Sequence, residues 1–228
     1  MEGVVKMLAL CAACLLFVAP LHEFEEVRRS KHVGERPVFP LVCMWANSSL
    51  WVIYGLCVGD FFPTVITNLF GFFLSVYYCA VYAWAVEPPS RKAATYNMFA
   101  ATFLAVCVII TFCLGSFSLN PRDVPDDRVQ QYSGVAASTS TALQYAAPLA
   151  QIVKVIGRRS TEGLSWMLAS VSLLCASLWL WYGMVTNNFF IYVPNILGVA
   201  FSTLQCCLFG VYPRKRMLKS KSQEKIAV

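Results

Sequence analysis

The segment SLWVIYGLCVGDFFPTVITNLFG, residues 49–71, recurs in the second half of the chain as SLWLWYGMVTNNFFIYVPNILG, residues 177–198. Residues 19–62 match 147–190 at a constant offset of 128, which becomes 127 after a one-residue gap. The matched residues are Ala19-Pro20-Leu21 with Ala147-Pro148-Leu149, Ser49-Leu50-Trp51 with Ser177-Leu178-Trp179, Tyr54-Gly55 with Tyr182-Gly183, Phe61-Phe62 with Phe189-Phe190, and Asn68 and Gly71 with Asn195 and Gly198. Chance readily pairs leucine with leucine between apolar segments, but seldom pairs proline, tryptophan, Tyr-Gly and Asn-x-x-Gly in one order. The sequence therefore indicates an internal duplication.

The composition indicates lipid as the main solvent of this chain. Of its 228 residues, 58% are hydrophobic and 13% are charged, whereas soluble domains carry about 25% charge. The mean hydropathy is +0.60. Seven helices of about 20 residues each, the length needed to cross a bilayer, leave no room for a soluble catalytic domain. Nearly all of the ten cysteines lie inside apolar runs without a paired framework, so we expect no enzyme activity, no metal site and no cofactor.

Seven apolar runs divide the chain, and the basic residues between them predict its orientation. The runs are 4–21, 38–58, 61–86, 94–118, 130–155, 164–186 and 188–212. Successive connections between the runs lie on alternate sides of the membrane. On this basis fifteen Lys and Arg residues lie on one side and three on the other. The excess of basic residues in cytoplasmic loops then places the N-terminus outside and the C-terminus in the cytosol. We expect the plasma membrane, with an internal membrane as the alternative. The net charge of +6 lies in these loop clusters and predicts no nucleic-acid partner.

The number of helices in each repeat determines how the repeats are oriented. Three helices are an odd number, so two directly joined repeats would be inverted in the membrane. The additional fourth helix turns the second repeat back. The sequence thus predicts an all-α membrane protein with seven transmembrane helices, in two parallel three-helix-bundle repeats joined by a linker helix. The predicted parts are the first repeat (1–86), the linker helix with an outer loop (87–128), the second repeat (129–212) and a basic cytosolic tail (213–228).

These motifs resemble the SWEET sugar transporters, which are relatives of the PQ-loop (MtN3/saliva) proteins. The second repeat carries the stronger likeness, through Pro148-Leu149, the Arg-Ser-Thr-Glu-Gly loop at 159–163, Trp179-x-x-Tyr182-Gly183 and Pro194-Asn195-x-x-Gly198. Both repeats and the linker helix are present, so the resemblance covers nearly the whole chain. It implies a carrier that binds a sugar between the two repeats, with the bilayer as its surroundings, and it leaves a homo-oligomer open.

The resemblance also implies a set of substrate-binding residues. The family holds its sugar between two tryptophans and two asparagines, which correspond here to Trp51, Trp179, Asn68 and Asn195. The remaining pocket positions lie four residues before each tryptophan and four and seven residues before each Pro-Leu pair. In this chain they are Asn47, Cys175, Leu16, Ala13, Gln144 and Thr141. Because carboxamides both donate and accept hydrogen bonds, Asn47 and Gln144 are expected to add polar capacity to the pocket.

Hinges and a gate complete the functional predictions. Pro20, Pro40 and Pro148 are the predicted hinges, because a proline in a helix removes a backbone hydrogen bond. The proline that the family carries after the Arg-Ser-Thr-Glu-Gly loop is replaced by Ser165, and Pro194 is a further kink candidate. Tyr54, Asp60 and Asn188 are the predicted outer gate, in which Asp60 is expected to bond Tyr54 or Asn188.

The sequence favours facilitated transport over coupled transport. The centres of the second to seventh runs contain no Asp, Glu, Lys, Arg or His, and a charge inside the membrane usually marks an ion or proton pathway. We therefore predict a bidirectional sugar uniporter that works by alternating access on a mono- or disaccharide. The main alternative is a proton-coupled PQ-loop-type carrier of an amino acid or organic acid, for which His22 and Glu23 are the nearest titratable groups. A seven-helix receptor fits less well, because a receptor does not require a three-helix duplication.

Overall fold

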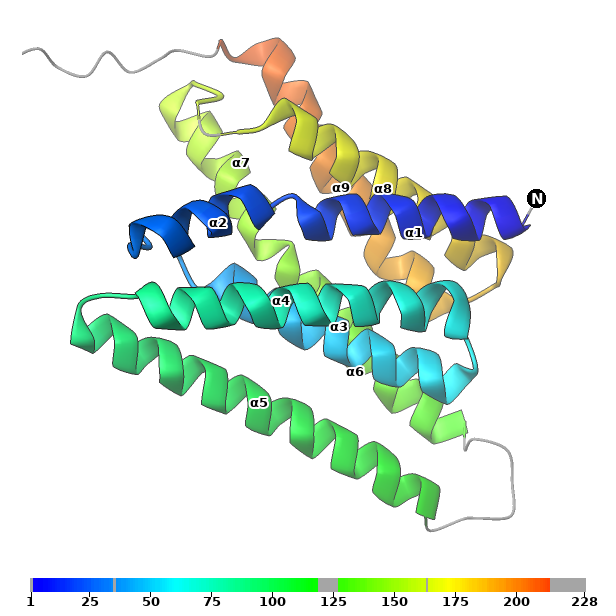
Figure 1. The fold of residues 1–228 in the computed structure, drawn as a ribbon. Coiled ribbons are helices and arrows are strands. Elements are labelled where there is room, and N and C mark those ends of the chain that lie inside the picture. Colours follow the sequence, from blue (N-terminus) through cyan, green and yellow to red (C-terminus); the bar gives the residue numbers. More distant parts are fainter. Residues whose placement is uncertain (1, 35, 119–126, 163, 214–228) are drawn as a thin grey trace, which may run out of the picture.

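Seven helical rods build the structure, and several of them are interrupted (Figure 1). The computed structural model describes residues 2–34, 36–118, 127–162 and 164–213. Its elements are α1 (Glu2–Val18), α2 (Leu21–Ser30), α3 (Phe39–Val58), the short segment η1 (Phe61–Val65), α4 (Ile66–Ala85), α5 (Pro89–Ser118), α6 (Asp127–Gln144), α7 (Ala146–Arg158), α8 (Trp166–Val185) and α9 (Phe189–Val211). The pairs α1–α2, η1–α4 and α6–α7 each form one rod. The predicted seven-helix, all-α fold is confirmed, while the predicted tail lies outside the described residues after Pro213.

The connections alternate between the two ends of the bundle. Figure 1 shows the N-terminus, residues 59–60 and residues 186–188 at one end, which we call the N-terminal end. Residues 31–34, 36–38, 86–88, 159–162 and 164–165 lie at the opposite end, which we call the tail end. Helices α1 and α6 both start at the N-terminal end, so the two repeats are parallel, as the count of three plus one plus three helices requires.

Each repeat packs its three rods in the same order, with the third rod between the other two. In the first repeat α4 contacts α1, α2 and α3, and in the second repeat α9 contacts α6, α7 and α8. The linker helix α5 lies outside, against α3, α4 and α6. The bundles meet along two seams, α3 with α6 and α1 with α8. A space enclosed by these seams lies on the pseudo-twofold axis, where equivalent residues of both repeats face each other.

One of the seven rods is less apolar than the others. Six described segments are long and apolar enough to cross a membrane, and the α6–α7 rod is not among them. Helix α6 contains the run SGVAASTST, residues 133–141. In the part of the chain that the structure describes, four of the five hydroxyl groups of this run, all except that of the exposed Thr139, bond inside the protein: for example, Ser133 Oγ lies 2.7 Å from the Val129 carbonyl, and Ser138 Oγ lies 2.8 Å from the Phe190 carbonyl. Because these bonds satisfy the four hydroxyl groups, the polar helix is compatible with a membrane interior.

The prolines occupy different places in their helices. Pro20 lies at the break between α1 and α2, and Pro148 follows the break at Tyr145 between α6 and α7. Pro40 lies in the first turn of α3, where a backbone N–H has no partner within the helix, so it removes no helical hydrogen bond and its role as a hinge stays a prediction. Ser165, which replaces the expected proline, caps α8 by accepting a bond from the Leu168 N–H at 3.3 Å.

Arg91 ties the linker helix to the first repeat. Its Nη1 lies 2.6 Å from the Gly34 carbonyl, and its Nη2 donates to the Tyr82 hydroxyl at 2.8 Å and to the Arg36 carbonyl. The guanidinium also lies 5.8 Å from the centre of the Tyr82 ring. These contacts hold the start of α5 against the connection between α2 and α3, so the linker helix belongs structurally to the first repeat.

Candidate functional site

A cavity of about 300 Å³ lies between the two bundles. This volume is at the lower end of the range for sites that enclose small organic ligands, about 300–1,000 Å³. All ten residues that the sequence predicted for the pocket line it: Ala13, Leu16, Asn47, Trp51, Asn68, Thr141, Gln144, Cys175, Trp179 and Asn195. The sequence did not predict the other wall residues: Phe17, Met44, Thr67, Tyr145, Pro148, Ser172, Ala176, Ile191, Phe201, Ser202 and Gln205. Among all these lining residues there is no Asp, Glu, Lys, Arg or His.

The two central asparagines have the same geometry. Asn68 Nδ2 donates to the Thr64 carbonyl at 2.9 Å, and Asn195 Nδ2 donates to the Ile191 carbonyl at 2.7 Å. Each bond reaches four residues back along the helix and fixes the direction of the side chain. A carboxamide has two N–H donors and an oxygen that accepts. Each asparagine therefore keeps one donor and its oxygen without a partner among the described residues.

The two tryptophans make the same aromatic contact, but among the described residues only one of them has a hydrogen bond for its indole N–H. The Trp51 ring meets the Tyr54 ring edge-on with centroids 5.5 Å apart, and the Trp179 ring meets the Tyr182 ring edge-on at 5.7 Å. These contacts fill the space between the cavity and the N-terminal end. Trp51 Nε1 donates to Thr141 Oγ1 at 2.8 Å. The indole N–H of Trp179 has no such partner in the part of the chain that the structure describes.

Hydrogen bonds cross one seam, and apolar contacts fill the equivalent part of the other. In the α3–α6 seam, Asn47 Oδ1 accepts from Ser140 Oγ at 2.7 Å and from Thr141 Oγ1 at 2.8 Å. In the same seam, Gln144 Nε2 donates to the Cys43 carbonyl at 3.2 Å. The equivalent part of the α1–α8 seam is an apolar cluster of Ala12, Ala13, Leu16, Phe17, Cys175, Leu178 and Trp179.

The two additional amides join the seam and also face the cavity. The Asn47 oxygen accepts from two donors, and Gln144 uses one donor on backbone. The Asn47 amide nitrogen, and one donor and the oxygen of Gln144, have no partner among the described residues, so the expectation that they add polar capacity to the pocket stays a prediction. The repeats share a backbone plan, but only one of the two seams is tied by these polar side chains.

An aromatic ring from each repeat packs directly on a glycine at the cavity wall. Phe17 and Tyr145 are equivalent at the offset of 128. A Cβ atom on Gly71 would lie 2.4 Å from the Phe17 ring, and a Cβ atom on Gly198 would lie 2.3 Å from the Tyr145 hydroxyl oxygen. Only a residue without a side chain admits these rings, which explains the Gly of each Asn-x-x-Gly motif. The sequence does contain a signal for these two wall residues, because each repeat has an aromatic residue three positions before its Pro-Leu pair.

Two tyrosines cross between the repeats at the N-terminal end. Tyr54 donates to Asn188 Oδ1 at 2.8 Å, and Tyr182 donates to Asp60 Oδ2 at 2.7 Å. The expectation that Asp60 bonds Tyr54 or Asn188 is therefore wrong. Thr64 is the second donor to the Asp60 carboxylate, at 2.5 Å. The predicted gate did not include Tyr182, although the offset of 128 relates it directly to Tyr54.

Comparisons with known proteins agree with this geometry. A family model described as "Sugar efflux transporter for intercellular exchange" (MtN3/saliva) matches residues 3–89 and again 131–217. The chain is 30% identical to the mouse protein named Sugar transporter SWEET1, over 90% of each chain. It is 27% identical to the protein of that name from Dictyostelium discoideum, over 95% of this chain and 97% of the relative. A solved structure of a eukaryotic SWEET transporter superposes with a TM-score of 0.77 at 20% identity, covering 92% of this chain and 95% of that chain.

Proposed function

Since this chain belongs to the MtN3/saliva or SWEET family, it is a sugar transporter, and we propose that it works as a facilitative, bidirectional uniporter of a mono- or disaccharide. The observation that carries the mechanism is the neutral cavity on the axis between two parallel bundles, with a tryptophan and an asparagine from each repeat in its wall. Its family transports sugars, and we propose no enzymatic activity for it.

The chemistry of the cavity suits a sugar. A sugar presents hydroxyl groups around its edge and C–H bonds on its faces. The free amide groups of Asn68 and Asn195 can exchange hydrogen bonds with the hydroxyl groups, and the indole rings offer flat apolar surfaces to the C–H faces. We propose these four residues as the core of the binding site. Neutral groups bind such a ligand weakly, and a millimolar dissociation constant corresponds to about −4 kcal/mol.

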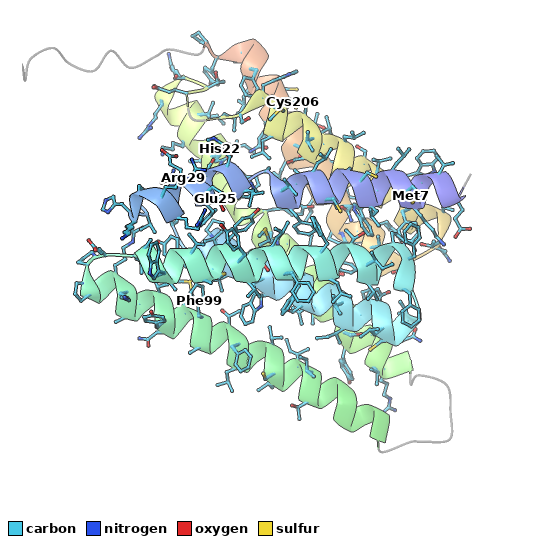
Figure 2. All side chains as sticks on the ribbon, in the orientation of Figure 1. Met7, His22, Glu25, Arg29, Phe99 and Cys206 are labelled. Atoms are coloured by element: carbon cyan, nitrogen blue, oxygen red, sulfur yellow. The ribbon has the colours of Figure 1, made fainter. Side chains whose placement is uncertain are left out.

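The absence of Asp, Glu, Lys, Arg and His from the lining residues supports transport without a coupled ion. The nearest candidates for proton coupling belong to α2 at the tail end, where Figure 2 labels His22, Glu25 and Arg29. Together with Glu26 and Ser30, these residues line a separate surface pocket. The proton-coupled alternative is not favoured, because all of its candidate groups lie outside the cavity walls.

We propose that transport proceeds by alternating access, with the bundles rocking about the cavity. The Tyr54–Asn188 and Tyr182–Asp60 bonds join the repeats at the N-terminal end, so this end must part before a sugar can pass. The breaks at Pro20 and Pro148 are the proposed hinges. The distribution of basic residues supports an orientation with the N-terminal end outside, and we propose the plasma membrane as the location.

Uptake of labelled glucose and sucrose in transport-deficient cells tests the proposed function. We expect saturable uptake of at least one of the two sugars that does not change when a protonophore collapses the proton gradient. Uptake that stops with the protonophore would instead support the coupled carrier and direct attention to His22 and Glu23. Uptake of neither sugar by protein verified at the surface would contradict the proposal.

The two cross-repeat tyrosine bonds are expected to differ in strength. Asp60 is an anionic acceptor and Asn188 is a neutral one, and bonds to charged groups are roughly twice as strong. Tyr182→Phe should therefore raise the population that is open at the N-terminal end by about 25-fold, and Tyr54→Phe by about fivefold. The measurement is the labelling rate of the cavity thiol of Cys175 by an impermeant reagent added outside, resolved by mass spectrometry. Equal and unchanged rates in both variants would show that these bonds do not close the cavity.

A further inference from the structure

The hydroxyl group of Thr67 is buried and has no partner. Thr67 lies on α4, is 1% exposed, and lines the central cavity. Its Oγ1 and the Oγ of Ser48 are the two buried side-chain polar atoms without a hydrogen bond in the described part of the chain. Because a buried hydroxyl without a partner destabilises a fold, such a group calls for an explanation.

Thr95 and Thr111 inside α5, and Thr186 directly after α8, satisfy their hydroxyl groups locally, by donating to the carbonyl four residues earlier at 2.8–2.9 Å. This local bond is a common solution for a threonine inside a helix. Thr67 does not make it, although its hydroxyl is buried.

Thr67 also breaks the symmetry of the cavity. At the offset of 127 that relates Asn68 to Asn195, the residue equivalent to Thr67 is Pro194, which has no hydroxyl group. Each of the two residues directly precedes the asparagine of its repeat, but only the first repeat places an unused donor and acceptor there. The tryptophan and asparagine pairs are twofold and by themselves could hold a sugar in two related orientations, and this hydroxyl adds to the polar α3–α6 seam in distinguishing one orientation from the other.

We propose that Thr67 is an additional substrate-contact residue, whose hydroxyl exchanges a hydrogen bond with one hydroxyl group of the transported sugar and so selects its orientation. This inference rests on the proposed sugar transport and goes beyond the tryptophan and asparagine pairs. Because Thr67 is 1% exposed in this conformation, its side chain has to rotate toward the cavity, where the bound sugar supplies the partner that the hydroxyl lacks in the protein alone.

The test compares two substitutions at Thr67 with one at Ser48. Thr67→Val keeps the shape of the side chain and removes the hydroxyl, whereas Thr67→Ser retains it. We expect Thr67→Val to raise the half-saturation constant for sugar uptake about fivefold, the effect of one neutral hydrogen bond, without lowering the melting temperature in detergent. Thr67→Ser should remain close to the native protein. Ser48→Ala, which copies Ala176 of the second repeat, should leave uptake unchanged, because Ser48 does not line the cavity.

Deoxy sugars identify the hydroxyl group that Thr67 contacts. The native protein should discriminate against one monodeoxy analogue in competition with the labelled sugar, and Thr67→Val should lose that discrimination only. If Thr67→Val keeps the native half-saturation constant, or shows the same discrimination at every position, the inference fails while sugar transport stands. If the native protein transports no sugar, the proposed function itself fails, so the two outcomes are distinguishable.

Discussion

Trp179→Ala is expected to reduce sugar uptake at least tenfold while the protein still reaches the membrane. The indole of Trp179 lines the cavity, and its N–H has no partner among the described residues. Removal of the ring deletes an apolar face and a donor that a sugar can use, but breaks no hydrogen bond across a seam. Trp51→Ala would be a less clean test, because Trp51 also bonds Thr141 of the other repeat.

A tryptophan two residues further along the same helix supplies the control. Trp181 is 45% exposed and does not line the cavity, so Trp181→Ala should preserve uptake. Asn195→Ala should act like Trp179→Ala, because it removes free amide groups from the cavity wall. Uptake would be normalised to surface protein measured by biotinylation. Native uptake by both Trp179→Ala and Asn195→Ala would refute the assignment of this cavity as the binding site.

Gly183→Ala is expected to cause a clear loss of stability by adding a single methyl group. A Cβ atom at Gly183 would lie 2.7 Å from the backbone nitrogen of Tyr192 and 2.9 Å from its Cβ. Backbone cannot turn aside as the end of a side chain can, so α8 and α9 would have to separate. Such overpacking costs about 1–3 kcal/mol. At about 2–4 °C per kcal/mol for a chain of this size, the melting temperature in detergent should fall by several degrees.

Alanine substitutions at two other glycines serve as controls for Gly183→Ala. Gly55 is the equivalent residue of the first repeat, where a Cβ would meet the end of the Val65 side chain at 2.7 Å. Because that side chain can shift, Gly55→Ala should destabilise less. Gly210 of α9 has nothing within 4 Å of an added methyl group, so Gly210→Ala should be neutral or slightly stabilising. A melting temperature for Gly183→Ala equal to that of Gly210→Ala would contradict the close packing of α8 on α9.

Part of the cavity wall could be predicted from the sequence, because the resemblance to the SWEET transporters implied the positions and the duplication supplied one set from each repeat. Duplicated motifs on parallel bundles must face each other across one axis, so Trp51 with Trp179 and Asn68 with Asn195 converge without any knowledge of loop geometry. Their roles in binding, like the hinges, the gate and the boundaries of the parts, remain predictions.

The amino-acid sequence by itself determined the helices, their number and the parallel order of the repeats. These features follow from the lengths of the apolar runs, the distribution of charge and the internal duplication, all of which can be seen without knowing how the helices pack. Only the tertiary structure decided which polar groups are used. Asp60 bonds Tyr182, the Asn47 oxygen is taken by Ser140 and Thr141, and the Thr67 hydroxyl is left without a partner. Hydrogen bonding depends on distances of a few tenths of an ångström between side chains from helices that are far apart in the sequence. A pattern of residues along one helix does not contain those distances.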